Sequence, residues 1–432
     1  MTTGTIERRL TTSPEAERAY LAGVHALLSL RSGALEHFAR ALALDPTFAL
    51  AHAALALMGH EFCAPVDSGA RVRAARLHAR RASPAERSHV DAVGRHVTGD
   101  RRALVRHLRA HPGDRLLLAA AVPTIAFAGV TEVPEDAWAI VESCGTALAG
   151  DWFHSALLAF VRQEQGRWDE AMDLAERSLA EVPGSGHAAH ARAHVHYETG
   201  DHTGGLDWLD DWIDGPGRGV DSVAHFAWHA AMHELSTGDL AAVGRRYARQ
   251  LSPRQVTGCR SVVDTGSLLW RWRLTPGATG VPAVPDGVAV PTATLLRPST
   301  PFVGLHAAIT LCAADDASGL GRLACWAAAH EHPVQRAVIA PLAQALRLLV
   351  LDQASAAADA LVAIGPDVWR VGGSDAQREV VEETLLHALL RSGRYDEART
   401  LVDRRLDRRR CRRDEWFRDA ADPCPDEPGR VS

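Results

Sequence analysis

The sequence predicts an all-α protein, a right-handed α-solenoid of antiparallel helix pairs of the tetratricopeptide type, extending over residues 1–413. A motif that begins with glycine recurs along the chain. Two of its copies, at Gly166 and Gly200, start 34 residues apart, which is the tetratricopeptide period. Alternating apolar and polar runs, which predict strands, are rare. Dividing the chain length by the period gives about ten to twelve helix pairs.

The motif is fullest at residues 166–171 (GRWDEA) and 393–398 (GRYDEA). Its glycine ends one helix and permits a tight turn. The aromatic residue fills the gap between helices, and the small alanine lets the second helix approach the first closely. A later proline ends the second helix. Partial copies are present at Gly99, Gly200, Gly238 and residues 34–46.

Three segments depart from this pattern. Residues 275–301 are rich in proline and glycine and are expected to form a long loop between two halves of the solenoid. Residues 414–432 contain three prolines, and we expect a disordered tail there. The arginine run at 404–413 is expected to be the solvated end of the last helix, where cations suit the helix dipole. Its alternative role is a contact with RNA or anionic lipid.

Composition excludes several classes of function. The chain contains no lysine, so all 47 basic residues are arginine, and both a pyridoxal phosphate (PLP) lysine and a P-loop nucleotide site are impossible. The net charge of −6 makes nucleic acid an unlikely partner. Seven cysteines without a CxxC motif indicate reduced thiols and a cytoplasmic location. Residues 1–9 lack the apolar core of a signal peptide, and the longest apolar run, 116–130, is too short to span a bilayer.

Six segments together resemble a known family. With them the chain is similar, from about residue 16 to about residue 405, to bacterial members of the tetratricopeptide repeat protein 38 family. This resemblance implies a helical-repeat fold and brings no established reaction. In the family a glutamate directly follows the HxH pair, whereas here Tyr197 precedes Glu198; Gly266 is also a departure. The six segments are 45–53 (DPTFALAHA), 86–93 (ERSHVDAV), 190–198 (HARAHVHYE), 225–231 (HFAWHAA), 262–271 (VVDTGSLLWR) and 372–390 (GGSDAQREVVEETLLHALL).

The best-defined candidate site consists of histidines at regular helical spacing. His190 and His194 stand four residues apart on one expected helix, and His225 and His229 repeat this spacing on the first helix of the next repeat. Residues at i and i+4 share a helix face, and the first helices of adjacent repeats lie side by side. The two pairs could therefore bind one divalent metal ion, Zn, Mn or Fe. Because the chain has 22 histidines, a metal-free cluster of hydrogen-bonded imidazoles remains the alternative.

Further residues on the following helices are candidates for catalysis. Asp264 and His306 could add a ligand or a base, and together with His229 they are the candidate catalytic residues. Residues 264–267 (DTGS) imitate an aspartic-protease signature, with Asp67 as a potential partner. That chemistry requires two β-lobes, and the helical context argues against it.

A second candidate site follows the paired glycines at 372–373. Ser374 can cap the next helix, so Gln377 and Arg378 would lie in its first turn and could grip an anion or a carboxylate. The alternative is that Arg378 pairs with glutamates of its own helix. Trp228 and Glu164, on other first helices, are expected to contribute to the same ligand-binding wall.

Two functions remain open at this point. The first is the binding of a small molecule or peptide in a concave groove lined by histidine and arginine. The second is a metal-dependent enzyme with a multi-histidine active site in the same groove. The identity of the ligand and the oligomeric state do not follow from the sequence.

Overall fold

The computed structural model describes residues 10–61, 64–100, 102–122, 137–284 and 286–422. Within these ranges all regular structure is helical, and two isolated β-bridges occur without any strand. The prediction of an all-α protein is therefore confirmed. None of the described helices is long and apolar enough to cross a membrane.

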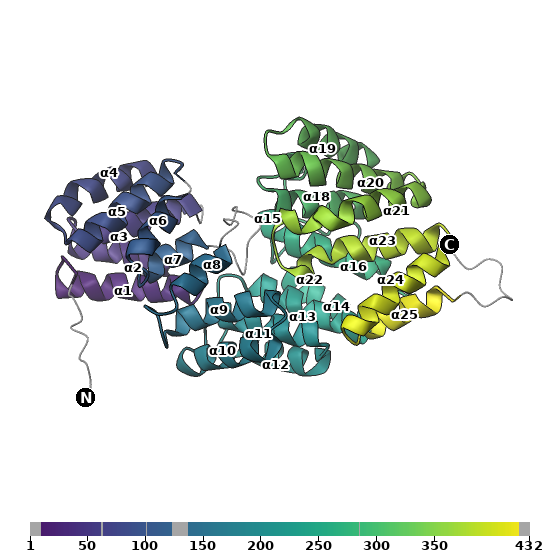
Figure 1. The fold of residues 1–432 in the computed structure, drawn as a ribbon, viewed down its shortest axis with the longest axis horizontal. Coiled ribbons are helices and arrows are strands. Elements are labelled where there is room, and N and C mark those ends of the chain that lie inside the picture. Colours follow the sequence, from purple (N-terminus) through teal and green to yellow (C-terminus); the bar gives the residue numbers. More distant parts are fainter. Residues whose placement is uncertain (1–9, 62–63, 101, 123–136, 285, 423–432) are drawn as a thin grey trace.

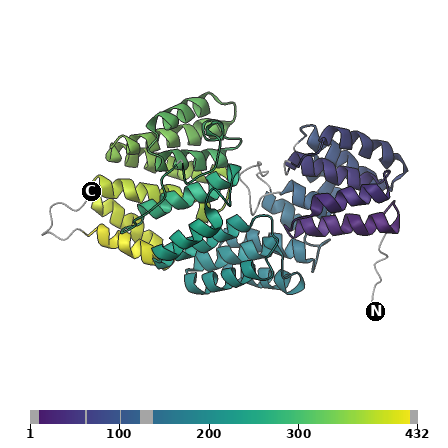
Figure 2. The ribbon, with the colours of Figure 1, turned by 180° about the vertical axis from the view of Figure 1, so that it is seen from behind.

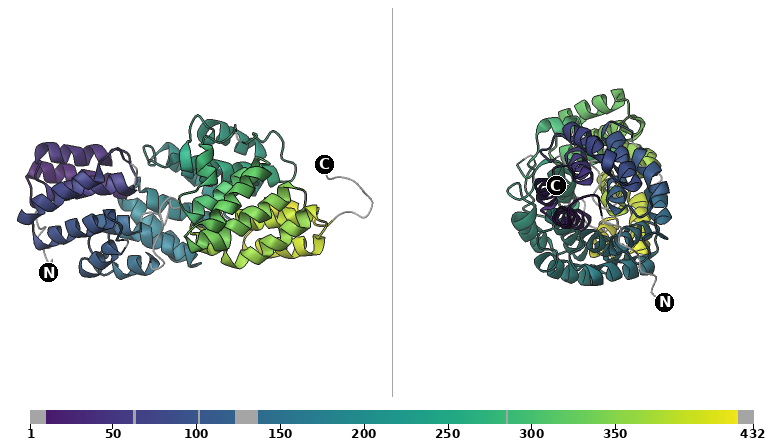
Figure 3. Two further views of the ribbon diagram at one scale, coloured as in Figure 1. Left: turned by 90° about the horizontal axis from the view of Figure 1, so that it is seen from above. Right: turned by 90° about the vertical axis from the view of Figure 1, so that its left-hand side faces the viewer.

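The helices form an N-terminal group and a C-terminal group, connected by a middle group (Figures 1 and 2). Seen from above, the two outer groups lie at opposite ends of an elongated molecule (Figure 3). The N-terminal group consists of α1 (Pro14–Leu28), α2 (Ala34–Leu44), α3 (Ala49–Glu61), α4 (Ser68–His78), the 3-10 helix η1 (Ala79–Arg81), α5 (Pro84–Val97), α6 (Ala103–Ala110), α7 (Arg115–Ala121) and α8 (Ala137–Ser143).

The middle group contains the glycine motifs at Gly166, Gly200 and Gly238. It consists of α9 (Trp152–Glu164), α10 (Trp168–Glu181), α11 (Gly186–Thr199), α12 (His202–Asp214), α13 (Val223–Thr237), α14 (Leu240–Arg246) and the π-helix η2 (Tyr247–Leu251). The C-terminal group consists of α15 (Gly258–Arg260), η3 (Ser261–Gly266), α16 (Ser267–Leu274), α17 (Thr292–Leu296), α18 (Pro301–Ala313), α19 (Ala317–Ala329), η4 (Gln335–Ile339), α20 (Ala340–Val350), α21 (Ala354–Ile364), η5 (Gly365–Val371), α22 (Asp375–Arg378), α23 (Val380–Arg391), α24 (Tyr395–Arg408) and α25 (Arg412–Ala420).

The motif residues act locally as expected. Gly200 and Gly238 end α11 and α13 in the left-handed conformation, with φ of 76° and 83°, which a residue with a Cβ adopts with difficulty. Ala171 and Ala398 are completely buried where the second helix of each pair approaches its neighbours. Consecutive helices pack together, and so do helices two apart, such as α9 with α11 and α11 with α13. This arrangement places α11 and α13 side by side.

All three segments that departed from the motif pattern differ from expectation, wholly or in part. Residues 275–301 are mostly irregular, but they contain the short helix α17. The prediction of a disordered tail is wrong for residues 414–422, because α25 docks on the fold. Phe417 is buried in the apolar core, and Asp414 is buried in an ion pair with Arg405 at 3.0 Å. Residues 423–432 lie outside the described part of the chain.

The arginine run is also not a solvated helix end. Arg405, Arg409 and Arg413 face inwards and are almost completely buried, whereas Arg404 and Arg410 are exposed. Each buried arginine pairs with a carboxylate, which offsets the loss of hydration. We call this group the arginine–carboxylate network; it consists of Arg271, Arg405, Arg409 and Arg413 with Glu198, Glu379, Glu383 and Asp414.

Candidate functional site

The structure brings all four histidines of the two i,i+4 pairs together, and we call them the four-histidine cluster. The Nε2 atom of His190 on α11 lies 3.1 Å from Nε2 of His194 and 3.0 Å from Nε2 of His225 on α13. The ring of His229 is centred 4.8 Å from the rings of His190 and His225 and 4.6 Å from that of His194. The convergence follows from the side-by-side packing of α11 and α13.

The cluster is not part of an open groove, contrary to expectation. All four rings are 1% exposed or less. Phe160 of α9 stacks on His190 with an interplanar angle of 9°, and Trp228 stacks on His225 with an angle of 7°. Trp228 was expected to bind a ligand in the groove, but it is buried as packing for a histidine.

Asp264 supports the cluster from the π-helix η3. Its Oδ1 atom accepts a hydrogen bond from Nδ1 of His225 at 2.9 Å, and its Oδ2 atom lies 3.6 Å from Arg260. Burial alone would raise the pKa of the Asp264 carboxyl, but His225 and Arg260 hold that pKa below its usual value. With the proton of His225 on Nδ1, the lone pair on its Nε2 atom faces His190. The helical setting of Asp264, and the position of Asp67 as the N-cap of α4, also exclude the aspartic-protease arrangement.

Burial keeps the clustered imidazoles neutral. It lowers the pKa of His194 to about 3 and the pKa values of His190 and His229 well below the usual range, and neighbouring histidines lower them further. Burial likewise lowers the pKa of His225, although Asp264 opposes the shift. At neutral pH these rings therefore offer lone pairs, the form that binds metal ions.

Hydrogen bonds between the four rings cannot provide a partner for every ring nitrogen in this cluster. A ring nitrogen carries either a proton or a lone pair, so Nε2 of His190 can serve only one of its two Nε2 neighbours. The Nε2 atom of His229 is buried and has no hydrogen-bond partner among the described residues. One atom of each of His190, His225 and His229 lies within 4.8 Å of the others. A tetrahedral ion with metal–nitrogen bonds of about 2.0–2.1 Å sets its ligands about 3.3 Å apart. The Nε2 atom of His190 lies at a similar distance from those of His194 and His225, 3.1 and 3.0 Å.

No family model matches this chain. The assignment of chemistry therefore depends on the geometry of its own residues. His306 of α18, the third candidate catalytic residue, packs edge-on against Phe302, and its two ring nitrogens are buried without hydrogen-bond partners among the residues described. Burial, and after it Arg271, lowers the pKa of His306 to about 3.

After the paired glycines at 372–373, two of the expected ligand-binding residues instead cap the start of α22. Ser374 and Gln377 form a reciprocal capping box. The Ser374 hydroxyl accepts from the backbone N–H of Gln377 at 3.3 Å, and the Gln377 side chain accepts from the N–H of Ser374 at 3.0 Å. Both residues are buried. The Ser374 hydroxyl and the Gln377 side-chain oxygen therefore stabilise the start of α22.

Arg378 does not pair with the glutamates of its own helix, which was the alternative to ligand binding. It bonds to Asp375 and the Gly373 carbonyl oxygen, and it lies 3.5 Å from Glu164 of α9, so its partners are not the glutamates of α23. Burial raises the pKa of Glu164 to about 7, and Asp375 adds to the shift while Arg378 opposes it. The structure thus brings the two predicted ligand residues Arg378 and Glu164 together.

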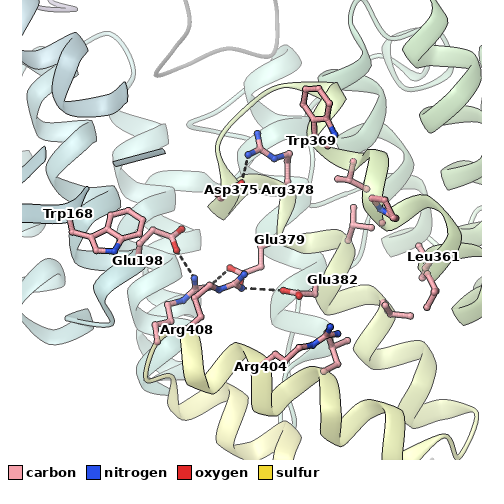
Figure 4. Close-up of a pocket in the computed structure, with 18 residues that line it drawn as sticks. Trp168, Glu198, Leu361, Trp369, Asp375, Arg378, Glu379, Glu382, Arg404 and Arg408 are labelled. Atoms are coloured by element: carbon pink, nitrogen blue, oxygen red, sulfur yellow. Dashed lines mark hydrogen bonds and ion pairs between the residues drawn. The ribbon is translucent and has the colours of Figure 1, made fainter. Parts of the chain in front are cut away.

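Arg378 also lines a cavity of about 620 Å³, which we call the C-terminal pocket (Figure 4). Trp168 stands on one side of it and Trp369 of η5, which is 68% exposed, on the other. Arg408 pairs with Glu379 in the wall, whereas Arg404 makes no hydrogen bond or ion pair with the described residues. The sequence singles out two residues of this pocket, Trp168 at the aromatic position of the motif and Arg378.

Proposed function

We propose that this protein binds a divalent metal ion at the four-histidine cluster, within a right-handed solenoid of tetratricopeptide type related to the tetratricopeptide repeat protein 38 family. The recurring motif and the packing of successive helices support the solenoid. The observation that supports the metal ion most directly is the position of the His190 Nε2 atom, 3.0 and 3.1 Å from two other imidazole nitrogens.

The donor set specifies the chemistry of the ion. Neutral imidazoles suit Zn²⁺ and the neighbouring first-row ions. Asp264 accepts the Nδ1 proton of His225, which orients that ring and increases the basicity of its other nitrogen, as partners behind metal-bound histidines commonly do. Asp264 therefore acts as a positioning residue in this proposal.

The burial of the cluster decides between a structural and a catalytic ion. Ligand atoms of His190, His225 and His229 lie within 4.8 Å of one another, and His194, which contacts His190, would be the fourth ligand. Four imidazoles complete a tetrahedral shell, and structural zinc sites are closed in this way, whereas catalytic sites keep one position open. Because each of the four rings is 1% exposed or less, we favour an ion that holds α11 and α13 together over the metal-dependent enzyme. A catalytic role would require His194 to leave the shell and admit a substrate.

The test compares the metal content of matched variants. Protein purified without chelators is analysed for metals together with the double variant His190→Ala, His229→Ala and the control His233→Ala. His233 lies one turn beyond His229 on α13, is equally buried and contacts His202 at 3.2 Å. We expect the double variant to have lost one equivalent of metal relative to the control. Equal metal content in the double variant and the control would refute the site.

The C-terminal pocket favours a second candidate function, the binding of a small anion with an apolar part. Arg404 supplies a cation that has no partner among the described residues, and Trp369 supplies an exposed aromatic face. Phenylacetate and inorganic phosphate serve as calorimetric probes, with Arg404→Gln as the variant and Arg410→Gln, an exposed arginine outside the pocket, as the control. Binding of phenylacetate that is weakened only by Arg404→Gln supports this function, and unchanged binding in that variant refutes it.

A further inference from the structure

A second set of potential metal ligands lies in the N-terminal group, on helices that the four-histidine cluster does not include. His89 of α5 and His107 of α6 both face Asp114, the residue that precedes α7. Nδ1 of His89 lies 2.7 Å from Oδ2 of Asp114, and Nε2 of His107 lies 3.0 Å from the same oxygen. One ligand atom from each of the three residues lies within 4.8 Å of the other two.

The surroundings fix these three side chains in place. The other oxygen of Asp114 accepts from the backbone N–H of Leu117 at 3.1 Å and so caps α7. Ser88 Oγ lies 2.9 Å from Nδ1 of His107. A hydroxyl both donates and accepts, so Ser88 can follow either tautomer of His107, including the one that presents its Nε2 lone pair to an ion.

A cavity of about 440 Å³, which we call the N-terminal pocket, adjoins these ligands. His89, His107 and Asp114 form part of its wall, together with Tyr20 and Glu86. The Nε2 atom of His89 is buried and has no hydrogen-bond partner among the residues that the structure describes. Its second ring nitrogen is therefore left unsatisfied by the protein alone.

The charges around the pocket suit a cation. Although burial opposes it, hydrogen bonds from Thr11 hold the pKa of Glu86 below its usual value. Arg115, the one arginine in the pocket wall, pairs with Asp151 at 3.0 Å. The carboxylates of Glu86 and Asp114 therefore line a cavity in whose described wall the single arginine is already paired.

We propose that His89, His107 and Asp114 bind a second divalent first-row metal ion, with its remaining coordination positions open towards the N-terminal pocket. Two imidazoles and one carboxylate are a donor set of open metal sites. A set of three protein ligands leaves at least one position for water or a small anion, which the closed four-histidine set does not. The alternative is a metal-free set of hydrogen bonds that joins α5, α6 and α7.

The test uses the His190→Ala, His229→Ala protein as background, so that its outcome is independent of the four-histidine cluster. Metal is removed, Co²⁺ is added, and bound Co²⁺ is measured by elemental analysis and by its visible absorbance. We expect one tightly bound equivalent that is lost in His107→Gln and in Asp114→Asn. The control is His96→Ala, which disrupts the separate and more exposed group His60, Glu61 and His96.

Two readouts keep the proposal falsifiable. Circular dichroism establishes that each variant is folded, and His107→Gln, which leaves the cap of α7 intact, replaces Asp114→Asn if that variant fails to fold. Azide should shift the Co²⁺ absorbance, because it can enter an open coordination position. The proposal is overturned if Co²⁺ does not bind to the background protein, if it is lost only in His96→Ala, or if azide leaves the spectrum unchanged.

Discussion

Replacing Glu383 by glutamine should destabilise the C-terminal group strongly. This carboxylate is completely buried, 3.1 Å from Nε of Arg271 and 3.0 Å from Nη1 of Arg413, and Arg405 lies 3.7 Å away. The four buried arginines of the arginine–carboxylate network balance its four carboxylates. Glu383→Gln keeps the shape of the side chain and removes one negative charge, so one buried positive charge is left uncompensated.

The magnitude follows from the burial of both partners. Removing one member of a buried ion pair destabilises a protein by about 3–5 kcal/mol, because the remaining charge has lost both its hydration and its partner. Glu383 serves two arginines at hydrogen-bond distance, so we expect a value in the upper part of that range. Burial raises the pKa of this carboxyl, but the arginines outweigh it and hold the pKa below its usual value, so the ionised form is the one that stabilises the fold.

The assay is urea unfolding followed by circular dichroism and tryptophan fluorescence. The matched control is Glu397→Gln, which removes an exposed carboxylate that pairs with Arg394 at 2.7 Å, and it should leave the unfolding midpoint nearly unchanged. Solvent replaces the lost partner there. If Glu383→Gln unfolds at the same urea concentration as the control, the network does not stabilise the fold as argued.

Four further outcomes are expected. Asp264→Asn should weaken metal binding about 10–100-fold in a chelator competition, and unchanged affinity would refute its positioning role. Burial lowers the pKa of His387 to about 4, below its unfolded value of about 6.5. Its neutral form therefore costs no stability above pH 6.5, and between pH 6.5 and 4 the free energy of unfolding should fall by about 1.4 kcal/mol per pH unit for each such histidine; urea unfolding at a series of pH values measures this, and a flat profile would contradict it. Gly266→Ala places a Cβ 2.2 Å from Oγ1 of Thr310 and should lower the free energy of unfolding by about 1–3 kcal/mol. The double variant with Thr310→Ala should recover part of this loss, and strictly additive effects of the two substitutions would contradict the clash. Deleting residues 411–432 should lower the melting temperature, and an unchanged melting temperature would contradict the docking of α25.

Local rules predicted the helices and the four-histidine cluster. Glycine with φ near +80° at a helix end, and the i,i+4 spacing of His190 and His194, are properties of short segments. The packing of α11 against α13 then makes the two histidine pairs spatial neighbours. The burial of the cluster did not follow from the sequence. It depends on Phe160 and Trp228, whose stacking on histidines is a tertiary contact that no spacing rule gives.

The predictions for the charged residues near the C-terminus were wrong. The arginines at 404–413 have the composition of a solvated helix end, and only the fold shows that Glu379 and Glu383, on the preceding helix pair, neutralise them. The same omission produced the wrong prediction for the tail, because Asp414 is held by Arg405. Asp114 was not identified from the sequence as a candidate ligand. Its position before a helix suggests only a capping role, and its contacts with two histidines arise from the tertiary structure.

The docking of the last helix has a consequence for the order of folding during synthesis. A stack of helix pairs can generally fold from its first pair onwards, because each pair contacts only its neighbours. Here Arg409 bonds to Glu198 at 2.9 Å, and the carbonyl oxygen of Arg410 accepts from His202 at 3.0 Å, so the end of the chain contacts the helix pair α11–α12. A nascent chain in which Arg409 is still inside the ribosome leaves Glu198 without this partner. The helix pair α11–α12 therefore gains these contacts only after residues 409–410 have left the ribosome.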